Sequence, residues 1–369
     1  MNELLLKISD SNNQVSTKTI KARQYLSREQ ARQMPFYEYF VRFVWTYKKG
    51  KVKDVTLQKY ILHAKFIASR VPEIKLADLD GSRSNVQLLL DTFGKEHRKN
   101  STLDFKASVI HSLKYARDDG FIDRLVSDGL AINSVERTWT QEKRVRVREQ
   151  PKFLQADEFE QLRNYLDERL NELLAQTPKI LKGSRATKLD FQTEYILISI
   201  ACHTGARYAE ILGITFRDVL DNSIKIDKTW NYRANVGGFK DTKNIYSIRN
   251  VQVDKTIIRQ IRKYWAWKNQ FINADPKMPL WYQDDLNMCN STLNKILRRT
   301  QKKLGINKNI SLHKLRHTYV SYLLANDIDE RFIARQVGHA DVNMIHRIYG
   351  HLLKEKADSE TKRIEQIMR

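Results

Sequence analysis

The sequence predicts a mainly α-helical protein with a small antiparallel β-sheet, divided into two domains. Its 369 residues exceed the roughly 250–300 residues at which a single hydrophobic core stops growing. Apolar residues recur at steps of three and four through most of the chain, which is typical of amphipathic helices. Two segments, 223–230 and 246–254, are instead typical of strands, and they flank a turn-rich connection with Gly237 and Gly238.

Residues 36–136 are expected to form a small domain of about four helices. Segments such as "TLQKYILHAKFIASRV" (56–71) and "STLDFKASVIHSLKYARDDG" (101–120) place their apolar residues on one stripe. Residues 1–35 are polar and weakly periodic, and are expected to be an arm or lead segment.

Residues 137–152, "RTWTQEKRVRVREQPK", are expected to be an extended basic linker between the two domains. The segment has no helical stripe and contains six Lys or Arg against two Glu. As a spacer it needs no further function. Beside a nucleic acid, it is suited to lie along phosphates.

Residues 153–353 are expected to form the second, larger domain. It begins with an amphipathic helix over 154–175 and continues with a largely apolar helix over 190–206, followed by the strands. Helices return from residue 255 onward. Residues 354–369 predict a charged helix with little apolar face, which is typical of a solvated tail.

The net charge is the first indication of function. A formal charge of +22 points to an anionic partner, with nucleic acid as the leading candidate. A merely well-solvated basic protein is the alternative. No apolar run of roughly 18 residues predicts a membrane span, and the N-terminus is not typical of a secretion signal. Two cysteines, Cys202 and Cys289, form neither a disulfide framework nor metal-ligand spacing, so a reducing cytosol is expected.

The helix predicted over 311–324 carries a candidate phosphate site. His313 and Arg316 lie three residues apart on one face, behind Ser311 as the N-cap. An arginine fork and the free N–H groups of a helix start together bind phosphate well. A capping histidine and an arginine in a salt bridge are the alternative, and the short motif alone favours that alternative.

The segment "HTGARYAEIL" (203–212) supplies a second arginine. Gly205 is expected to end the apolar helix, and a new helix begins around Arg207. An unpaired guanidinium is costly there, so either Glu210 or a bound anion is expected to satisfy it. His203 follows Cys202 without a surrounding ligand set, which favours core packing over a metal site.

Two further segments complete the candidate set. Lys240 and Lys243 in "KDTKNIYSIR" either protect a strand edge or reach into DNA from a hairpin. In "VGHADVNMIHRIYGHLL", Gly338 is expected to follow the end of a helix, with His339 in an exposed turn. Tyr349 follows ten residues later, and alone it predicts an ordinary half-buried aromatic.

The order T-G-x-R, lysine on a hairpin, H-x-x-R-H-T, G-H and then tyrosine resembles the tyrosine recombinase (phage integrase) family, especially integrases of phages and mobile elements from Gram-positive bacteria. The resemblance covers about residues 36–369. It implies a helical core-binding domain over 36–136 and a mixed α/β catalytic domain over 153–353, together a clamp around DNA. It also implies accessory DNA binding by residues 1–35 and docking of residues 354–369 on a neighbouring protomer.

The resemblance implies a role for each catalytic residue. Arg207 and Arg316 would bind the non-bridging oxygens of the scissile phosphate and stabilise the transition state. His313 and His339 would position the phosphate and move the tyrosine proton. Tyr349 would attack the phosphorus to give a 3′-phosphotyrosyl link, so that rejoining needs no ATP.

Lys243 would donate a proton to the departing 5′ oxygen by the same resemblance. It is preferred over Lys240 because its spacing to Ser247 and Arg249 matches the family's hairpin. Glu210 matches an acidic position that supports the site. Independently of the resemblance, a tyrosine with a pKa near 10 needs positive charge around it to act as a nucleophile.

The expected partner is a double-stranded DNA attachment site, with the protein a homotetramer on DNA and a monomer or weak oligomer when free. A directionality factor and a DNA-bending protein are further partners, no membrane is involved, and the bacterial cytoplasm is the expected location. No cofactor or metal is expected, because no acidic metal-binding cluster lies near the motifs. The candidate DNA-contacting residues are Lys59, Arg98, Lys99, Arg144, Arg146, Arg148 and Lys240.

Three other functions compete with a recombinase that integrates or excises a phage or mobile element. A type IB topoisomerase uses the same chemistry, but the helical N-terminal domain and the motif spacing favour the recombinase. A DNA-binding regulator without catalysis would not need the complete motif set. A basic RNA-binding protein would explain the charge but not the motif order.

Overall fold

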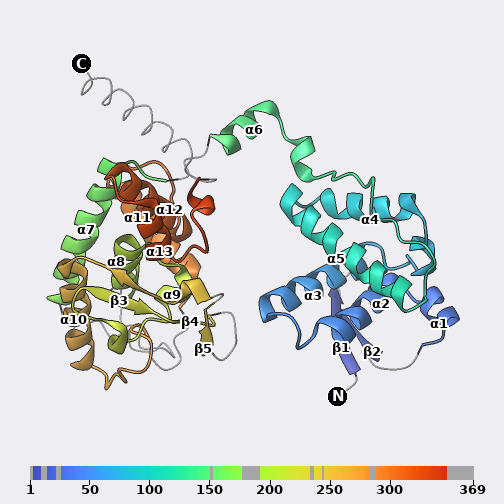
Figure 1. Ribbon diagram of the computed structural model, residues 1–369, viewed down its shortest axis with the longest axis horizontal. Helices are drawn as coiled ribbons and strands as arrows, with labels where there is room; N and C mark the ends of the chain where they lie inside the picture. Colours follow the sequence, from blue (N-terminus) through green and yellow to red (C-terminus); the bar gives the residue numbers. More distant parts are fainter. Residues whose placement is uncertain are drawn as a thin grey trace. The chain divides into compact units, whose positions relative to one another are not determined.

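The computed structural model describes residues 3–9, 15–21, 26–149, 153–176, 192–232, 237–242, 245–282 and 288–346 (Figure 1). Tertiary contacts divide the chain into two units, Met1–Glu149 and Gln150–Arg369. The predicted class, mainly helical with small antiparallel sheets, is confirmed. Among the helices described, none is long and apolar enough to cross a membrane.

The first unit combines a hairpin with helices. Strands β1 (Glu3–Ser9) and β2 (Val15–Lys21) pair antiparallel, with Glu3 opposite Lys21. The helices of this unit, including a π-helical turn η1 and two 3₁₀ turns, are α1 (Arg28–Gln33), α2 (Phe36–Phe43), η1 (Val44–Lys48), α3 (Asp54–Arg70), η2 (Ala77–Leu79), α4 (Arg83–Gly94), α5 (Lys99–Asp118), η3 (Val135–Thr138) and α6 (Gln141–Arg148).

Aromatic side chains fill the core of the first unit. Phe93 and Phe105 stack with ring centroids 4.1 Å apart, and Phe66 meets both of them edge-on. Among these rings His63 bonds the Ser108 hydroxyl at 3.0 Å, and burial lowers its pKa to about 4. The unit therefore has a hydrophobic core of its own, as a domain requires.

The extended conformation predicted for residues 137–152 is wrong over much of that segment, because Gln141–Arg148 form helix α6. Thr140 caps this helix by accepting a hydrogen bond from the Lys143 N–H at 3.3 Å. Glu142 lies in the first turn, and Arg146 and Arg148 lie in the last turn, where their charges complement the helix dipole. Capping and charge order thus support a helix that lacks an apolar stripe.

The second unit contains the remaining elements. They are α7 (Ala156–Leu174), α8 (Gln192–Thr204), α9 (Tyr208–Ile211), η4 (Phe216–Asp218), β3 (Ser223–Ile226), β4 (Lys228–Trp230), β5 (Phe239–Asp241), η5 (Ile245–Ser247), β6 (Arg249–Gln252), α10 (Lys255–Asn269), α11 (Asn290–Lys303), α12 (Leu312–Ala325) and α13 (Glu330–Val337). Strand β3 pairs antiparallel with β6, and β4 pairs antiparallel with β5. The sheet predicted from the sequence is therefore two short ladders.

Helix α8 forms the centre of the second unit. Its residues are buried along almost the whole length, and α7, α10, α11 and α12 all pack against it. This position explains the continuous apolar sequence, since a helix covered on all sides needs no polar face. The segment that follows α8, including Arg207, is therefore held next to the hydrophobic core of the second unit.

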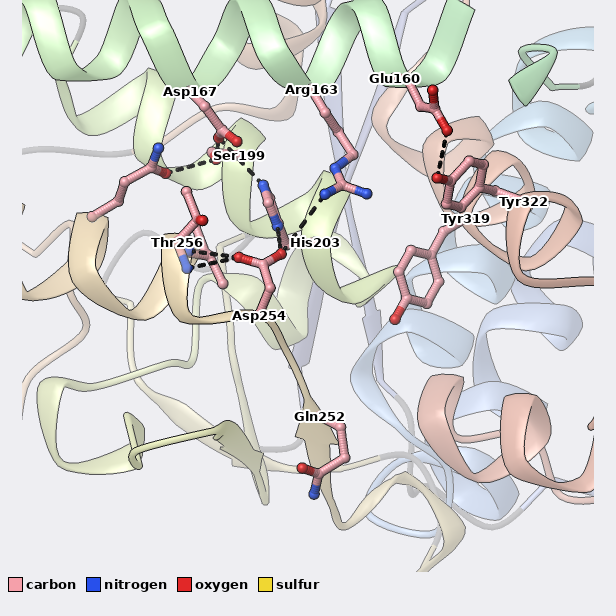
Figure 2. Close-up of polar contacts among 12 residues, drawn as sticks. Glu160, Arg163, Asp167, Ser199, His203, Gln252, Asp254, Thr256, Tyr319 and Tyr322 are labelled. Carbon is pink, nitrogen blue, oxygen red and sulfur yellow. Dashed lines mark hydrogen bonds and ion pairs between the residues drawn. The ribbon is translucent and has the colours of Figure 1, made fainter. Parts of the chain in front are cut away.

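A buried histidine ties α8 to α7 and to the start of α10 (Figure 2). His203 Nδ1 lies 2.7 Å from Asp254 Oδ2, and Nε2 lies 3.3 Å from Asp167 Oδ1. An ionised carboxylate only accepts hydrogen bonds, so the imidazolium form of the ring, which carries hydrogen on both nitrogens, satisfies both contacts. Burial opposes this charge, but the hydrogen bonds to Asp167 and Asp254 outweigh it and raise the pKa of His203.

The first testable prediction is a pH-dependent contribution of His203 to stability. Its folded pKa lies above the unfolded value of about 6.5. The stabilisation is therefore complete below about pH 6.5 and is lost as the pH rises through the folded pKa. Thermal unfolding should show a larger loss of stability in His203→Gln at about pH 6 than at about pH 9.

His63→Gln is the matched control with the opposite sign. Because the pKa of His63 is lowered to about 4, wild-type His63 contributes more stability as the pH rises from there to about 6.5. A His203→Gln effect that does not change with pH would mean that folding does not shift the pKa of His203.

Candidate active site

Gly205 makes the turn that brings Arg207 to the site. The glycine has φ +58° directly after α8, a conformation that L side chains rarely adopt. A Cβ at this position would lie 2.5 Å from Cδ1 of Tyr319 on α12. The close approach of the T-G-x-R turn to α12 therefore depends on glycine at this position.

Arg207 and Arg249 share the carboxylate of Glu210. The Arg207 guanidinium donates from Nη1 to Oε1 at 2.7 Å, and its backbone N–H donates to Oε2 at 3.0 Å. Arg249 donates from Nη2 to the same Oε2 at 3.0 Å. Burial opposes ionisation of Glu210, but the charges of Arg249 and Arg207 outweigh it and lower its pKa. Of the two partners considered for Arg207, Glu210 or a bound anion, the structure shows the contact with Glu210.

Helix α12 contributes His313 and Arg316. As expected, Ser311 caps the helix and accepts a hydrogen bond from the Lys314 N–H at 3.4 Å. The buried Arg316 side chain reaches across to α8 and donates from Nη1 to the Gly205 carbonyl at 3.0 Å. Burial, together with the charges of Arg316 and Arg207, lowers the pKa of His313.

The end of α13 brings the G-H motif, Gly338 and His339, close to Arg207. Gly338 has φ +70° after the last helical residue, as expected, and its carbonyl accepts from Arg207 Nη2 at 3.3 Å. His339 is half-buried rather than exposed, which corrects the sequence-based expectation. Burial, followed by the charges of Arg316 and Arg207, lowers its pKa to about 4. Its Nδ1 is buried and has no hydrogen-bond partner among the described residues.

The arrangement suits a tetrahedral anion. Two arginines from different elements lie beside two histidines whose pKa values are lowered by burial and by those same arginines. Arg207 remains 37% exposed at its side chain, so its guanidinium can still meet a ligand. A bound anion would relieve the repulsion between these groups, since it supplies the negative charge that favours each protonated form.

The structure brings together Arg207, Glu210, His313, Arg316 and His339, five of the predicted site residues. Lys243 and Tyr349 lie outside the described residues. In the part of the chain that the structure describes, no cluster of His, Cys, Asp or Glu could hold a metal ion.

The candidate DNA-contacting residues are all exposed. Lys59 pairs with Asp104 at 2.7 Å, the Arg98 guanidinium lies 5.1 Å from the Trp139 ring centroid, and the Arg144 guanidinium donates to the Arg137 carbonyl at 3.0 Å. The others are Lys99 on α5, Arg146 and Arg148 on α6, and Lys240 on β5.

Sequence reasoning missed two buried polar residues beside the site. Arg249 begins β6 and bonds Glu210, and Gln336 on α13 bonds the Tyr319 hydroxyl at 3.2 Å. A charged residue in a strand ordinarily predicts a solvent-facing position. The only available signal for Arg249 was its place in the hairpin spacing.

Comparisons with known proteins match residues 152–356 to the phage integrase family. The integrase of Staphylococcus phage L54a is 29% identical over 175 residues, which are 44% of this chain and 49% of that protein. The chain therefore spans about half the length of that relative. Tyrosine recombinase XerD of Rickettsia bellii is 22% identical over 285 residues, which are 69% of this chain and 88% of that protein.

A solved structure shares the fold at low sequence identity. The integrase of transposon Tn1549, determined in complex with transposon right end DNA, matches with a TM-score of 0.62 and 16% identity. The match covers 90% of this chain and 100% of that one.

The second testable prediction concerns the Gly205 turn. Gly205→Ala should lower the free energy of unfolding by about 1–2 kcal/mol for the left-handed backbone and about 1–3 kcal/mol more for the contact with Tyr319. Gly305→Ala is the matched control, since Gly305 has φ +75° but nothing within 4 Å of an added Cβ. Urea unfolding of both variants should separate the two terms, and equal losses would contradict the close approach to Tyr319.

Proposed function

The chain belongs to the phage integrase family, the tyrosine-type site-specific recombinases, and from this premise we propose that it integrates or excises a phage or mobile element through a 3′-phosphotyrosyl intermediate. The observation that carries the proposal is the meeting of Arg207, Arg316, His313 and His339 at one place from three separate motifs. The positive charge of this cluster is complementary to the negative charge of a phosphodiester in DNA.

Arg207 and Arg316 bind the non-bridging oxygens of the scissile phosphate in this mechanism. Their guanidinium groups are held by Glu210 and by the Gly205 and Gly338 carbonyls before any ligand arrives. Donors fixed in advance stabilise the charge of the transition state without reorganisation. His313 and His339 have lowered pKa values, so each is suited to take up or hand on a proton near the phosphate.

Tyr349 and Lys243 complete the reaction that we propose. The Tyr349 oxygen attacks the phosphorus and passes its proton to His313 or His339. The bond to the 5′ oxygen breaks, and Lys243 protonates that oxygen to give a free 5′ hydroxyl. The phosphodiester energy is kept in the phosphotyrosyl link, so a 5′ hydroxyl from another strand can reverse the step. Rejoining thus needs neither ATP nor a metal ion.

We further propose that residues 36–136 bind DNA and that residues 153–353 contain the catalytic site, as a clamp around the duplex. The exposed cations on α3, α5, α6 and β5 would neutralise phosphates, in agreement with the net charge of +22. Exchange between two duplexes breaks four strands, and each break forms a link to one Tyr349. Because each protomer has one Tyr349, the reaction requires four protomers. Residues 1–35 are proposed to bind accessory DNA sites, and residues 354–369 to dock on a neighbouring protomer.

The cell supplies the remaining partners in this proposal. A directionality factor and a DNA-bending protein would select integration or excision, and the bacterial cytoplasm gives access to the attachment sites. A type IB topoisomerase would form the same covalent link but would relax one duplex without exchanging strands. Recombination between two attachment sites on separate molecules therefore distinguishes the two activities.

The third testable prediction is that Tyr349 forms the covalent link. A DNA substrate nicked beside the candidate attachment site should trap a protein–DNA adduct with wild type, and Tyr349→Phe should form none. Tyr322→Phe is the matched control, because the Tyr322 hydroxyl bonds Glu160 at 2.7 Å on the surface of α12. An adduct of undiminished yield with Tyr349→Phe would show that another residue is the nucleophile.

The fourth testable prediction separates chemistry from binding at Arg316. Arg316→Ala should slow cleavage about 10²–10³-fold, the cost of losing one preorganised donor to the transition state. DNA affinity should fall by less than about tenfold, since one phosphate contact among many is lost. Arg262→Ala serves as the control, because Arg262 forms an exposed pair with Asp221. Parallel losses of affinity and cleavage would indicate a structural role for Arg316.

A further inference from the structure

Arg249 is a buried arginine at the start of β6, and its guanidinium is directed at three different segments. Nη2 donates to Glu210 Oε2 at 3.0 Å, Nε donates to the Gln336 carbonyl at 2.8 Å, and Nη1 donates to the Ser247 carbonyl at 2.9 Å. Its side chain is only 6% exposed, so it is poorly placed to meet DNA itself. A buried guanidinium is costly unless its donors are used, and each nitrogen of this one has an acceptor.

The Arg249 contact with Glu210 bears directly on Arg207. Oε2 of Glu210 accepts from both Arg249 and the Arg207 backbone, which leaves Oε1 facing the Arg207 guanidinium. Rotation of the carboxylate would break these bonds together. Arg249 thus fixes the acceptor that directs the Arg207 side chain.

The contact with α13 bears on the other side of the site. A Cβ at Gly338 would lie 2.9 Å from Arg249 Nη1, so the guanidinium packs closely on the turn that precedes His339. The Gly338 carbonyl in turn accepts from Arg207. Gln336 also joins α13 to β6. Its side-chain amide accepts a hydrogen bond from the Gln252 N–H and donates one to the Gln252 carbonyl. The end of α13 and the Arg207 turn are therefore joined through one arginine.

We propose that Arg249 is a positioning residue for DNA strand cleavage, which directs the Arg207 guanidinium by holding the Glu210 carboxylate against the end of α13. This inference rests on the proposed function of the same site. Arg249 touches neither the phosphate nor the nucleophile in this role. It acts through Glu210, so its loss changes the cleavage step rather than the affinity for DNA.

The test compares Arg249→Met, which keeps an unbranched apolar stem without the charge, with Arg249→Lys, which keeps the charge without the planar guanidinium. Covalent adduct formation is measured in single turnover on the nicked substrate over a range of protein concentrations. Arg249→Met should lower the saturating rate about 100-fold, because small misplacements of catalytic groups cost that much, while the half-saturating concentration stays near the wild-type value. Arg249→Lys should recover part of the rate, since lysine keeps the charge but cannot reach all three acceptors of the guanidinium.

Arg262→Met is the matched control for loss of one positive charge, because Arg262 lies in an exposed pair with Asp221. Near-UV circular dichroism and urea titration give the folded fraction, so each rate refers to folded protein. Arg249→Met that cleaves at the wild-type rate per folded molecule would overturn the role. A wild type that forms no adduct would instead overturn the proposed function itself.

A double variant tests whether Arg249 acts through Glu210. If it does, Glu210→Gln combined with Arg249→Met should cleave no more slowly than the slower single variant. Losses that multiply in the double variant would mean that the two residues act independently, and would overturn the proposed pathway.

Discussion

The buried carboxylate of Glu210 is the interaction on which the rest of the site depends. It lies between Arg207 and Arg249 and accepts from both, with distances of 2.7–3.0 Å. Without it, the buried Arg249 guanidinium would lose its carboxylate partner and would face the positive charge of Arg207, which is destabilising. Because one carboxylate serves two arginines and Arg316 adds a third cation nearby, the site keeps the positive charge that a phosphodiester requires.

The lowered pKa values of His313 and His339 are partly explained by the same positive charges. Burial together with Arg316 and Arg207 lowers the pKa of both His313 and His339, so the site disfavours a protonated histidine when no anion is bound. A phosphate bound to the arginines would reduce that repulsion and raise both pKa values. In the proposed mechanism, binding of the scissile phosphate and protonation of the histidines would therefore be coupled.

The sequence could predict those parts of the site that local rules determine. Gly205, Ser311 and Gly338 end or begin helices, so the positions of Arg207, His313 and His339 at element termini followed from capping and turn chemistry. Arg249 and Gln336 could not be predicted, because they bond residues 39 and 84 positions away in the chain. Helix α6 was missed because its caps and charges, rather than an apolar stripe, support it.

The position of α8 explains why the site can be formed before DNA binds. Arg207 follows directly from a helix that is covered on all sides, and His203 joins that helix to α7 and α10 through two carboxylates. Arg316 then bonds the Gly205 carbonyl at the end of the same helix. Displacing either arginine relative to the other would require a shift in a close-packed core, which is resisted more strongly than a movement of surface loops. Fixed charges of this kind stabilise a transition state more than they stabilise a flexible substrate.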